Sequence, residues 1–213
     1  MISHLSEKHI LLGITGSIAA YKSVDLASKL TQAGALVDVI MTEAATKFVT
    51  PLTFQSVTGR KIYNDLWGDE AHFVHVGLAE AADLFVIAPA TADIMAKLAH
   101  GLAGDLLTVT ALASRCPLLI APAMDGGMYS HPATQSNEKI LRDRGITFID
   151  PAEGRMASGL IGKGRMVEPS VLLDHIRYVL SRNGALKGKK VVVTAGGTQE
   201  DIDPVRFISN HSS

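Results

Sequence analysis

The stretch HILLGITGSIAAYKS, residues 9–23, contains the pattern that decides the fold. Residues 9–15 are almost all apolar, which predicts a strand buried on both faces instead of one that alternates between core and solvent. Gly13 and Gly16 permit a tight turn after this strand, and Ser17 opens a segment with helical spacing. A buried strand, a glycine turn and a helix form the repeating unit of parallel α/β sheets.

The same unit recurs along the chain. Further apolar runs cover 36–42, 84–90, 117–123 and 146–150, and segments with helical spacing cover 17–33, 92–100, 104–114, 133–144 and 170–182. This alternation predicts an α/β fold with a doubly wound parallel sheet, Rossmann-like (flavodoxin-like), in three layers. Because ligands of such sheets bind beyond the carboxyl ends of the strands, we expect the functional site there.

The composition is that of a folded globular protein, with 47% hydrophobic and 19% charged residues. The formal net charge is −1, from 20 basic and 21 acidic residues, which predicts no nucleic-acid or membrane partner. No apolar run reaches the ~18 residues that span a bilayer, and the N-terminus lacks a targeting pattern, so we expect a cytoplasmic protein. The single cysteine, Cys116, is predicted to be a buried, unreactive thiol.

A polar, glycine-containing segment near residue 185 divides the chain. We expect residues 1–182 to form the main domain, 183–189 a linker, and 190–213 the truncated start of a second α/β domain. The last segment begins with VVVTAGG, which predicts a new strand followed by a glycine turn. With no further elements to cover it, this segment is expected to have no activity of its own.

Hydroxyl-bearing and small residues follow the predicted strands. After the first strand, the Ser17 hydroxyl and the next two backbone N–H groups suit a phosphate, although an ordinary strand-to-helix turn fits them equally. Thr42 follows the second strand, and Thr91 and Asp93 follow the strand at 84–90. Thr42 and Asp93 also fit a plain helix cap. Ala90 and the neighbouring alanines leave room for a flat ring against the backbone.

Two further features carry protonatable or charged groups. His72 and His75 are three residues apart but lack the additional ligands of a metal site, so no metal is predicted. His75 directly precedes a helix start and fits a general base. The segment GRMASGLIGKGRMVEP (154–169) contains four glycines and three basic residues. It fits either a lid that closes over an anionic substrate or an exposed hairpin.

Four segments resemble the flavin-containing cysteine decarboxylase family, and within it the phosphopantothenoylcysteine decarboxylases. They are GITGSIAAYK (13–22), HVGLAEAADLFVIAPATADIMAKLAHGLAGDLLT (75–108), PAMDGGMYSHPATQ (122–135) and GRMASGLIGKGRM (154–166). The tail LKGKKVVVTAGGTQEDIDPVRFISNHSS (186–213) resembles the start of a phosphopantothenate–cysteine ligase. The resemblance implies FMN-dependent decarboxylation of 4′-phosphopantothenoylcysteine to 4′-phosphopantetheine, in coenzyme A biosynthesis. It also implies FMN bound between subunits of a homotrimer, alone or assembled into a dodecamer.

The resemblance also implies the roles of individual residues. The FMN-binding residues would be Gly16, Ser17, Ile18, Thr42, Ala90, Thr91 and Asp93. The catalytic residues would be His75, Asp125 and Ser158. The substrate-binding residues would be Met124, Met128, Tyr129, Ala157, Gly159, Lys163 and Arg165. In the implied mechanism the substrate's thiol end is oxidised to a thioaldehyde with help from His75, CO2 is lost to give an enethiol, and reduction with proton donation completes the product.

Two residues depart from the family pattern, which has asparagine at Asp125 and cysteine at Ser158. An ionised aspartate cannot donate a hydrogen bond to the substrate carboxylate. Asp125 therefore acts as a protonated donor, or favours CO2 loss by repulsion, or weakens binding. Ser158 is a far poorer acid than a thiol. Two alternatives follow: an oxidative decarboxylase that releases an enethiol from a cysteine-terminated peptide, and a non-catalytic flavoprotein subunit with a regulatory role.

Overall fold

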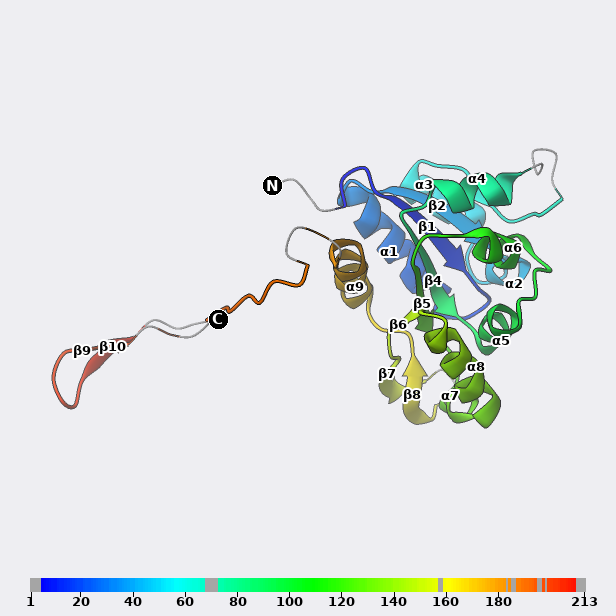
Figure 1. Ribbon diagram of the computed structural model, residues 1–213. Coiled ribbons are helices and arrows are strands. Elements are labelled where there is room, and N and C mark those ends of the chain that lie inside the picture. Colours follow the sequence, from blue (N-terminus) through cyan, green and yellow to red (C-terminus); the bar gives the residue numbers. More distant parts are fainter. Residues whose placement is uncertain are drawn as a thin grey trace. The chain divides into compact units, whose positions relative to one another are not determined.

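The computed structural model describes residues 5–67, 73–156, 159–182, 184, 187–194, 197 and 199–209. The chain forms two units, divided between residues 181 and 182. The first unit contains one parallel sheet in the order β3-β2-β1-β4-β5-β6, which confirms the predicted α/β class (Figure 1). Its strands are β1 (His9–Ile14), β2 (Leu36–Met41), β3 (Ile62–Tyr63), β4 (Leu84–Ala90), β5 (Leu118–Pro122) and β6 (Thr147–Phe148).

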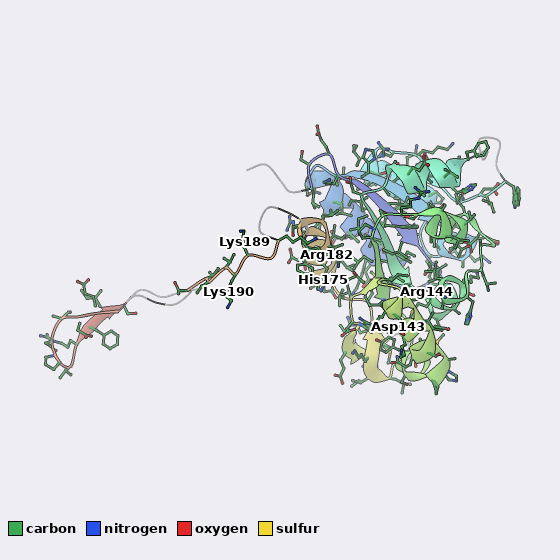
Figure 2. All side chains as sticks on the ribbon, viewed as in Figure 1. Asp143, Arg144, His175, Arg182, Lys189 and Lys190 are labelled. Carbon is green, nitrogen blue, oxygen red and sulfur yellow. The ribbon has the colours of Figure 1, made fainter. Side chains whose placement is uncertain are left out.

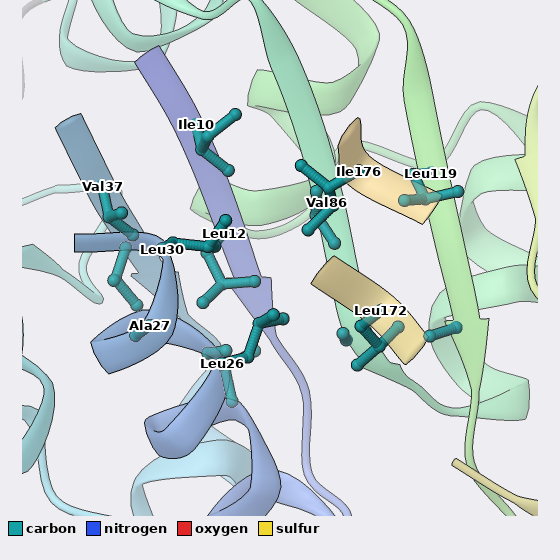
Figure 3. Close-up of a cluster of buried hydrophobic side chains, with 14 of the residues drawn as sticks. Ile10, Leu12, Leu26, Ala27, Leu30, Val37, Val86, Leu119, Leu172 and Ile176 are labelled. Carbon is teal, nitrogen blue, oxygen red and sulfur yellow. The ribbon is translucent and has the colours of Figure 1, made fainter. Parts of the chain in front are cut away.

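Helices cover both faces of this sheet and produce the three predicted layers. One face packs against α1 (Ala20–Gln32), α3 (Pro51–Thr58) and α9 (Pro169–Ser181). The other packs against α4 (Val74–Ala81), α5 (Ala92–His100), α6 (Leu106–Ala113) and α8 (Pro132–Asp143). Successive strand residues point to opposite layers: Ile10 and Leu12 belong to the first core, shown in Figure 3, and Leu11 to the second. Two-sided burial explains the unbroken apolar runs of the strands.

The sheet has one strand more than the sequence predicts. β3 is only two residues long and has no apolar run, so periodicity does not reveal it. A tertiary ion pair helps to position it: the Arg60 guanidinium donates to both carboxylate oxygens of Asp38 on β2, at 2.8 and 3.0 Å. The side-chain hydrogen bond with Asp38 raises the pKa of Arg60. Three helices, α2 (Glu43–Thr46), α3 and α7 (Gly126–Ser130), also lie outside the predicted segments.

The glycine-rich segment that follows the sheet forms an antiparallel hairpin, β7 (Ala152–Arg155) with β8 (Ile161–Arg165). In the second unit, the predicted strand at 191–194 is wrong, because these residues carry no strand in the structure. A strand is stable only with a neighbour to share its backbone hydrogen bonds. The strands of this unit are instead β9 (Gln199–Asp201) and β10 (Phe207–Ser209), paired antiparallel.

Charged side chains such as Asp143 and Arg144 stand on the outer surface of the first unit, and Lys189 and Lys190 belong to the second (Figure 2). None of the helices within the described residues is long and apolar enough to cross a membrane.

A buried hydroxyl joins the carboxyl ends of the two central strands. Thr15, which follows β1, donates from its Oγ1 to the carbonyl oxygen of Pro89 on β4 at 2.6 Å. The same Oγ1 accepts from the backbone N–H of Thr91 at 3.2 Å. Thr15 thus fixes the two turns beyond these strands relative to each other, at the edge of the sheet where ligands of this fold bind.

Replacing Thr15 by valine should lower the free energy of unfolding by about 2–4 kcal/mol. The valine leaves the Pro89 carbonyl and the Thr91 N–H without a partner, and each such buried group costs ~1–3 kcal/mol. Urea denaturation followed by circular dichroism measures the change. Thr15→Ser keeps the hydroxyl and should stay within about 1 kcal/mol of the wild type. Equal losses in both variants would show that the methyl group, not the hydroxyl, is what the fold needs.

Candidate active site

A cavity of about 480 Å³ lies beyond the carboxyl ends of β1, β4 and β5. The turn after β1, the start of α5, the loop after β5 and the β7–β8 hairpin all line it. Its volume is within the ~300–1,000 Å³ that is typical of small-molecule sites. The structure brings eight of the predicted site residues together here: Gly16, Ser17, Ile18, Thr91, Met124, Asp125, Met128 and Arg165.

In the turn after β1, Gly16 lies so close to α2 that there is no room for a side chain. A Cβ added to Gly16 would lie 2.5 Å from the Cβ of Ala44 on α2. Thr42 caps this short helix, its hydroxyl accepting from the Ala45 N–H at 3.2 Å, and is not among the cavity-lining residues. Ser17 does line the cavity, and its Oγ accepts from the Ala19 N–H at 3.3 Å. The hydroxyl hydrogen of Ser17 is thereby left to donate to a ligand.

The three residues predicted after β4 are placed differently from one another. Thr91 lines the cavity and also caps α5, its hydroxyl accepting from the Ile94 N–H at 3.4 Å. Ala90 is fully buried in the second core. Asp93 pairs with Lys97 at 2.9 Å on a largely exposed face of α5 and is not among the lining residues.

The loop that carries Asp125 connects β5 with α7. Asp125 is half-buried and caps α7, its carboxylate accepting from the Gly127 N–H at 3.0 Å. This cap explains how a carboxylate is held at the end of a buried strand. The adjacent Met124 and the exposed Met128 give the same part of the cavity an apolar wall.

The β7–β8 hairpin is docked on this loop by hydrogen bonds from two backbone N–H groups of the loop. The Met124 N–H donates to the carbonyl oxygen of Gly164 at 3.0 Å, and the Gly126 N–H donates to the Sδ of Met156 at 3.0 Å. A Cβ on Gly164 would collide with the Met124 carbonyl oxygen. The glycines of this segment therefore allow a close approach between the hairpin and the Asp125 loop.

A second cavity, of about 620 Å³, lies on the other side of the same loop, and Asp125 and Met156 border both cavities. Tyr129 and Lys163 line the second one, with the Lys163 Nζ 5.8 Å from the centre of the Tyr129 ring. Burial, together with the neighbouring Glu138 carboxylate, raises the pKa of Tyr129 to about 12. Tyr129 therefore stays neutral near pH 7 and provides a hydroxyl, not a phenolate.

Four charged residues line the first cavity: Lys22, Asp125, Arg155 and Arg165. Arg155 was not among the predicted site residues. Its symmetrical position in the basic hairpin, with one arginine on β7 and one on β8, is the sequence signal that could have identified it. The Lys22 Nζ is buried and donates to the Met166 carbonyl at 3.1 Å and to Glu168 at 2.7 Å.

The remaining predicted residues lie elsewhere. His75 is half-buried on α4, outside the lining of either cavity, and its buried Nδ1 has no hydrogen-bond partner within the described residues. Gly159 follows the tip of the hairpin with φ +86° and lines neither cavity. His72, Ala157 and Ser158 lie outside the described residues.

Cys116 is half-buried, and burial raises the pKa of its thiol, as an unreactive role requires. Across the described ranges, no group of three or more His, Cys, Asp or Glu side chains is arranged to hold a metal ion.

Family comparison assigns a class to this fold and site. Residues 2–181 match the Flavoprotein family, and the chain belongs to that family. Residues 186–213 match the C-terminal domain of the DNA/pantothenate metabolism flavoproteins. Both halves of the predicted resemblance are thus confirmed.

The relatives extend this class to a particular kind of protein. The chain is 47% identical over 213 residues to the coenzyme A biosynthesis bifunctional protein CoaBC of Bacillus subtilis (strain 168), covering 98% of this chain and 52% of the relative. It is 48% identical over 211 residues to the CoaBC protein of Vibrio cholerae, covering 98% of this chain and 53% of the relative. The chain spans about half the length of these curated relatives.

Solved structures share the fold. A PPC decarboxylase mutant complexed with pantothenoylaminoethenethiol matches with a TM-score of 0.71 and 32% identity, over 81% of this chain and 97% of that one. The FMN-dependent cysteine decarboxylase SpaF matches with a TM-score of 0.71 and 33% identity, over 85% of this chain and 99% of that one.

Replacing Gly164 by alanine should destabilise the docked hairpin by about 1–3 kcal/mol, the usual cost of inserting a methyl group where there is no room. The new Cβ would force β8 away from the Met124 carbonyl. Thermal unfolding measures the loss. Gly162→Ala is the matched control on the same strand, because its Cβ would meet the Met156 Cε at an ordinary 3.5 Å. If the two variants melt at the same temperature, the close approach at Gly164 is not required.

Proposed function

We propose that this chain catalyses the FMN-dependent decarboxylation of 4′-phosphopantothenoylcysteine to 4′-phosphopantetheine in coenzyme A biosynthesis. The observation that carries the proposal is the composition of the first cavity. It places a phosphate-binding type of turn (Gly16–Ile18), the Asp125 loop and a basic hairpin around one volume. The similar solved structures support the same reaction, since they include a PPC decarboxylase and an FMN-dependent cysteine decarboxylase. Such a substrate and cofactor fit a cytoplasmic enzyme.

The residues of the turn after β1 fit the phosphate of FMN. Gly16 leaves no side chain between this turn and α2, and the backbone around Ser17 and Ile18 lines the cavity directly. Backbone N–H groups before a helix, with a hydroxyl beside them, stabilise a phosphate. Thr91, which lines the cavity from the start of α5, would contact another part of the same cofactor. When bound, FMN supplies the two-electron redox chemistry that the reaction needs.

The chain's own residues would orient the substrate and control its charges. Met124 and Met128 offer an apolar wall for the aliphatic part of the substrate. Asp125, whose carboxylate accepts from the Gly127 N–H, would act on the substrate's carboxylate end. The docked hairpin borders this end of the cavity and would hold its basic side chains near the substrate.

His75 would assist removal of a proton, yet it does not line the cavity of its own chain. We therefore propose that it acts at the cavity of a neighbouring subunit in a homotrimer, alone or within a dodecamer of trimers. His75 is only half-buried as a residue, so part of it stays accessible to a second subunit. A monomeric and fully active enzyme would contradict this assembly.

The proposed reaction is tested by mass spectrometry of the substrate. The purified protein should show the visible absorbance of a bound flavin and should convert phosphopantothenoylcysteine with a loss of ~44 mass units, the mass of CO2. A loss of ~46 would show that the reaction stops at the enethiol, since two hydrogens are then not returned. If the flavin-loaded protein converts neither this substrate nor a cysteine-terminated peptide, the chain is instead a non-catalytic flavoprotein subunit.

Replacing Asp125 by asparagine should lower the KM for the substrate about tenfold, equivalent to ~1.4 kcal/mol, without reducing kcat. Two neighbouring carboxylates repel, whereas the amide can donate to the substrate carboxylate. Asparagine caps a helix as well as aspartate does, so the loop should keep its conformation. Steady-state kinetics of both proteins measure the effect. A fall in kcat of a hundredfold would instead show that the acid takes part in the chemical step.

A further inference from the structure

We propose that Arg155 and Arg165 together bind the phosphate group of the substrate and make that phosphate the feature by which the site selects it. This inference rests on the proposed function, because it assigns a role within the same cavity. Both arginines line the first cavity and both are exposed residues. Neither has a carboxylate partner in the part of the chain that the structure describes.

The hairpin places the two arginines at one border of the cavity. Arg165 lies across the neighbouring strand, with its Nη1 2.6 Å from the position that a Cβ on Gly154 would occupy. Arg155 is the next residue of β7, and the lining of the cavity includes both arginines, one from each strand of the hairpin. The base of the hairpin is held by Lys22, which donates to the carbonyl oxygen of Met166 next to Arg165.

Among the described residues, the charges that line the cavity leave an excess of positive charge. The remaining charged residues of the lining are Lys22 and Asp125. Lys22 is paired with Glu168 at 2.7 Å, and the single carboxylate of Asp125 can offset at most one of the two arginines. A phosphate monoester carries a charge of about −1.5 to −2 at pH 7, and planar guanidinium groups bind it through paired hydrogen bonds. Two such groups therefore match one phosphate.

The substrate has a second anion, its carboxylate, but the chemistry argues against pairing that group with arginine. The negative charge leaves the carboxylate as CO2 departs, so a strong ion pair there would stabilise the ground state more than the transition state. Binding energy from the remote phosphate carries no such penalty. The phosphate of FMN has its own candidate site at the turn of Gly16, Ser17 and Ile18, which all line the cavity at the start of a helix.

The experiment compares ligands that differ by the phosphate alone. Calorimetric dissociation constants for 4′-phosphopantothenate and pantothenate should be measured on the flavin-loaded wild type, Arg155→Ala, Arg165→Ala and the double variant. A charge-assisted hydrogen bond contributes ~1.5–3 kcal/mol, so each single variant should weaken phosphopantothenate binding about tenfold and the double variant about a hundredfold. Pantothenate affinity and the flavin absorbance should not change. Lysine at each position should restore part of the affinity.

Arg115→Ala is the matched control, because this exposed arginine precedes β5 at the opposite end of the sheet and lines neither cavity. Its phosphopantothenate affinity should equal that of the wild type. Three results would overturn the inference: an unchanged preference for the phosphorylated ligand, an equal loss for both ligands, or a loss of flavin that shows the arginines to hold the cofactor phosphate. Because these readouts measure binding, they stand whether or not the wild type decarboxylates phosphopantothenoylcysteine, and failure of the proposed reaction is seen separately in the mass assay.

Discussion

Burial of the central sheet on both faces is the constraint on which the rest of this structure depends. β1 and β4 send alternate side chains into two separate cores, so their interiors have no position at which a polar side chain reaches solvent. Polar chemistry is therefore displaced to the ends of the strands. There the backbone groups that leave the sheet need partners. Thr15 supplies two of these hydrogen bonds with one hydroxyl and so aligns the turns that surround the cavity.

The cavity is built by close approach of backbones more than by side chains. Gly16 brings the first turn against α2, and Gly164 brings the hairpin against the carbonyl of Met124. Both contacts exclude a β-carbon, and both lie directly beside residues that line the cavity. The shape of the site thus depends on two positions that carry no functional group. Asp125 shows the complementary case, since one carboxylate both caps a helix and borders two cavities.

Much of the fold could be predicted from the sequence because its signals are local. The apolar runs at 9–15, 36–42, 84–90 and 117–123 all became parallel strands, as two-sided burial requires. The start of α1 was predicted three residues too early, since residues 17–19 form a turn in which the Ala20 N–H donates to the Ser17 carbonyl. β3 could not be predicted, because the Asp38–Arg60 pair that helps to position it joins residues 22 apart. In the site, the ends of the predicted strands indicated the turn after β1 and the Asp125 loop. Whether Arg155 lines the cavity depends on the register of the β7–β8 hairpin, which the sequence does not reveal.

The burial of Lys22 determines how this side chain reacts with chemical labels. Its amino group is buried under the junction of β8 and α9, where the Met166 carbonyl and Glu168 cover it, while lysines such as Lys139 stand open on the surface. Amine-reactive labels will therefore modify the surface lysines first and spare Lys22 for as long as the junction is closed. The extent of labelling of Lys22 therefore measures how often the contacts of its amino group with Met166 and Glu168 open.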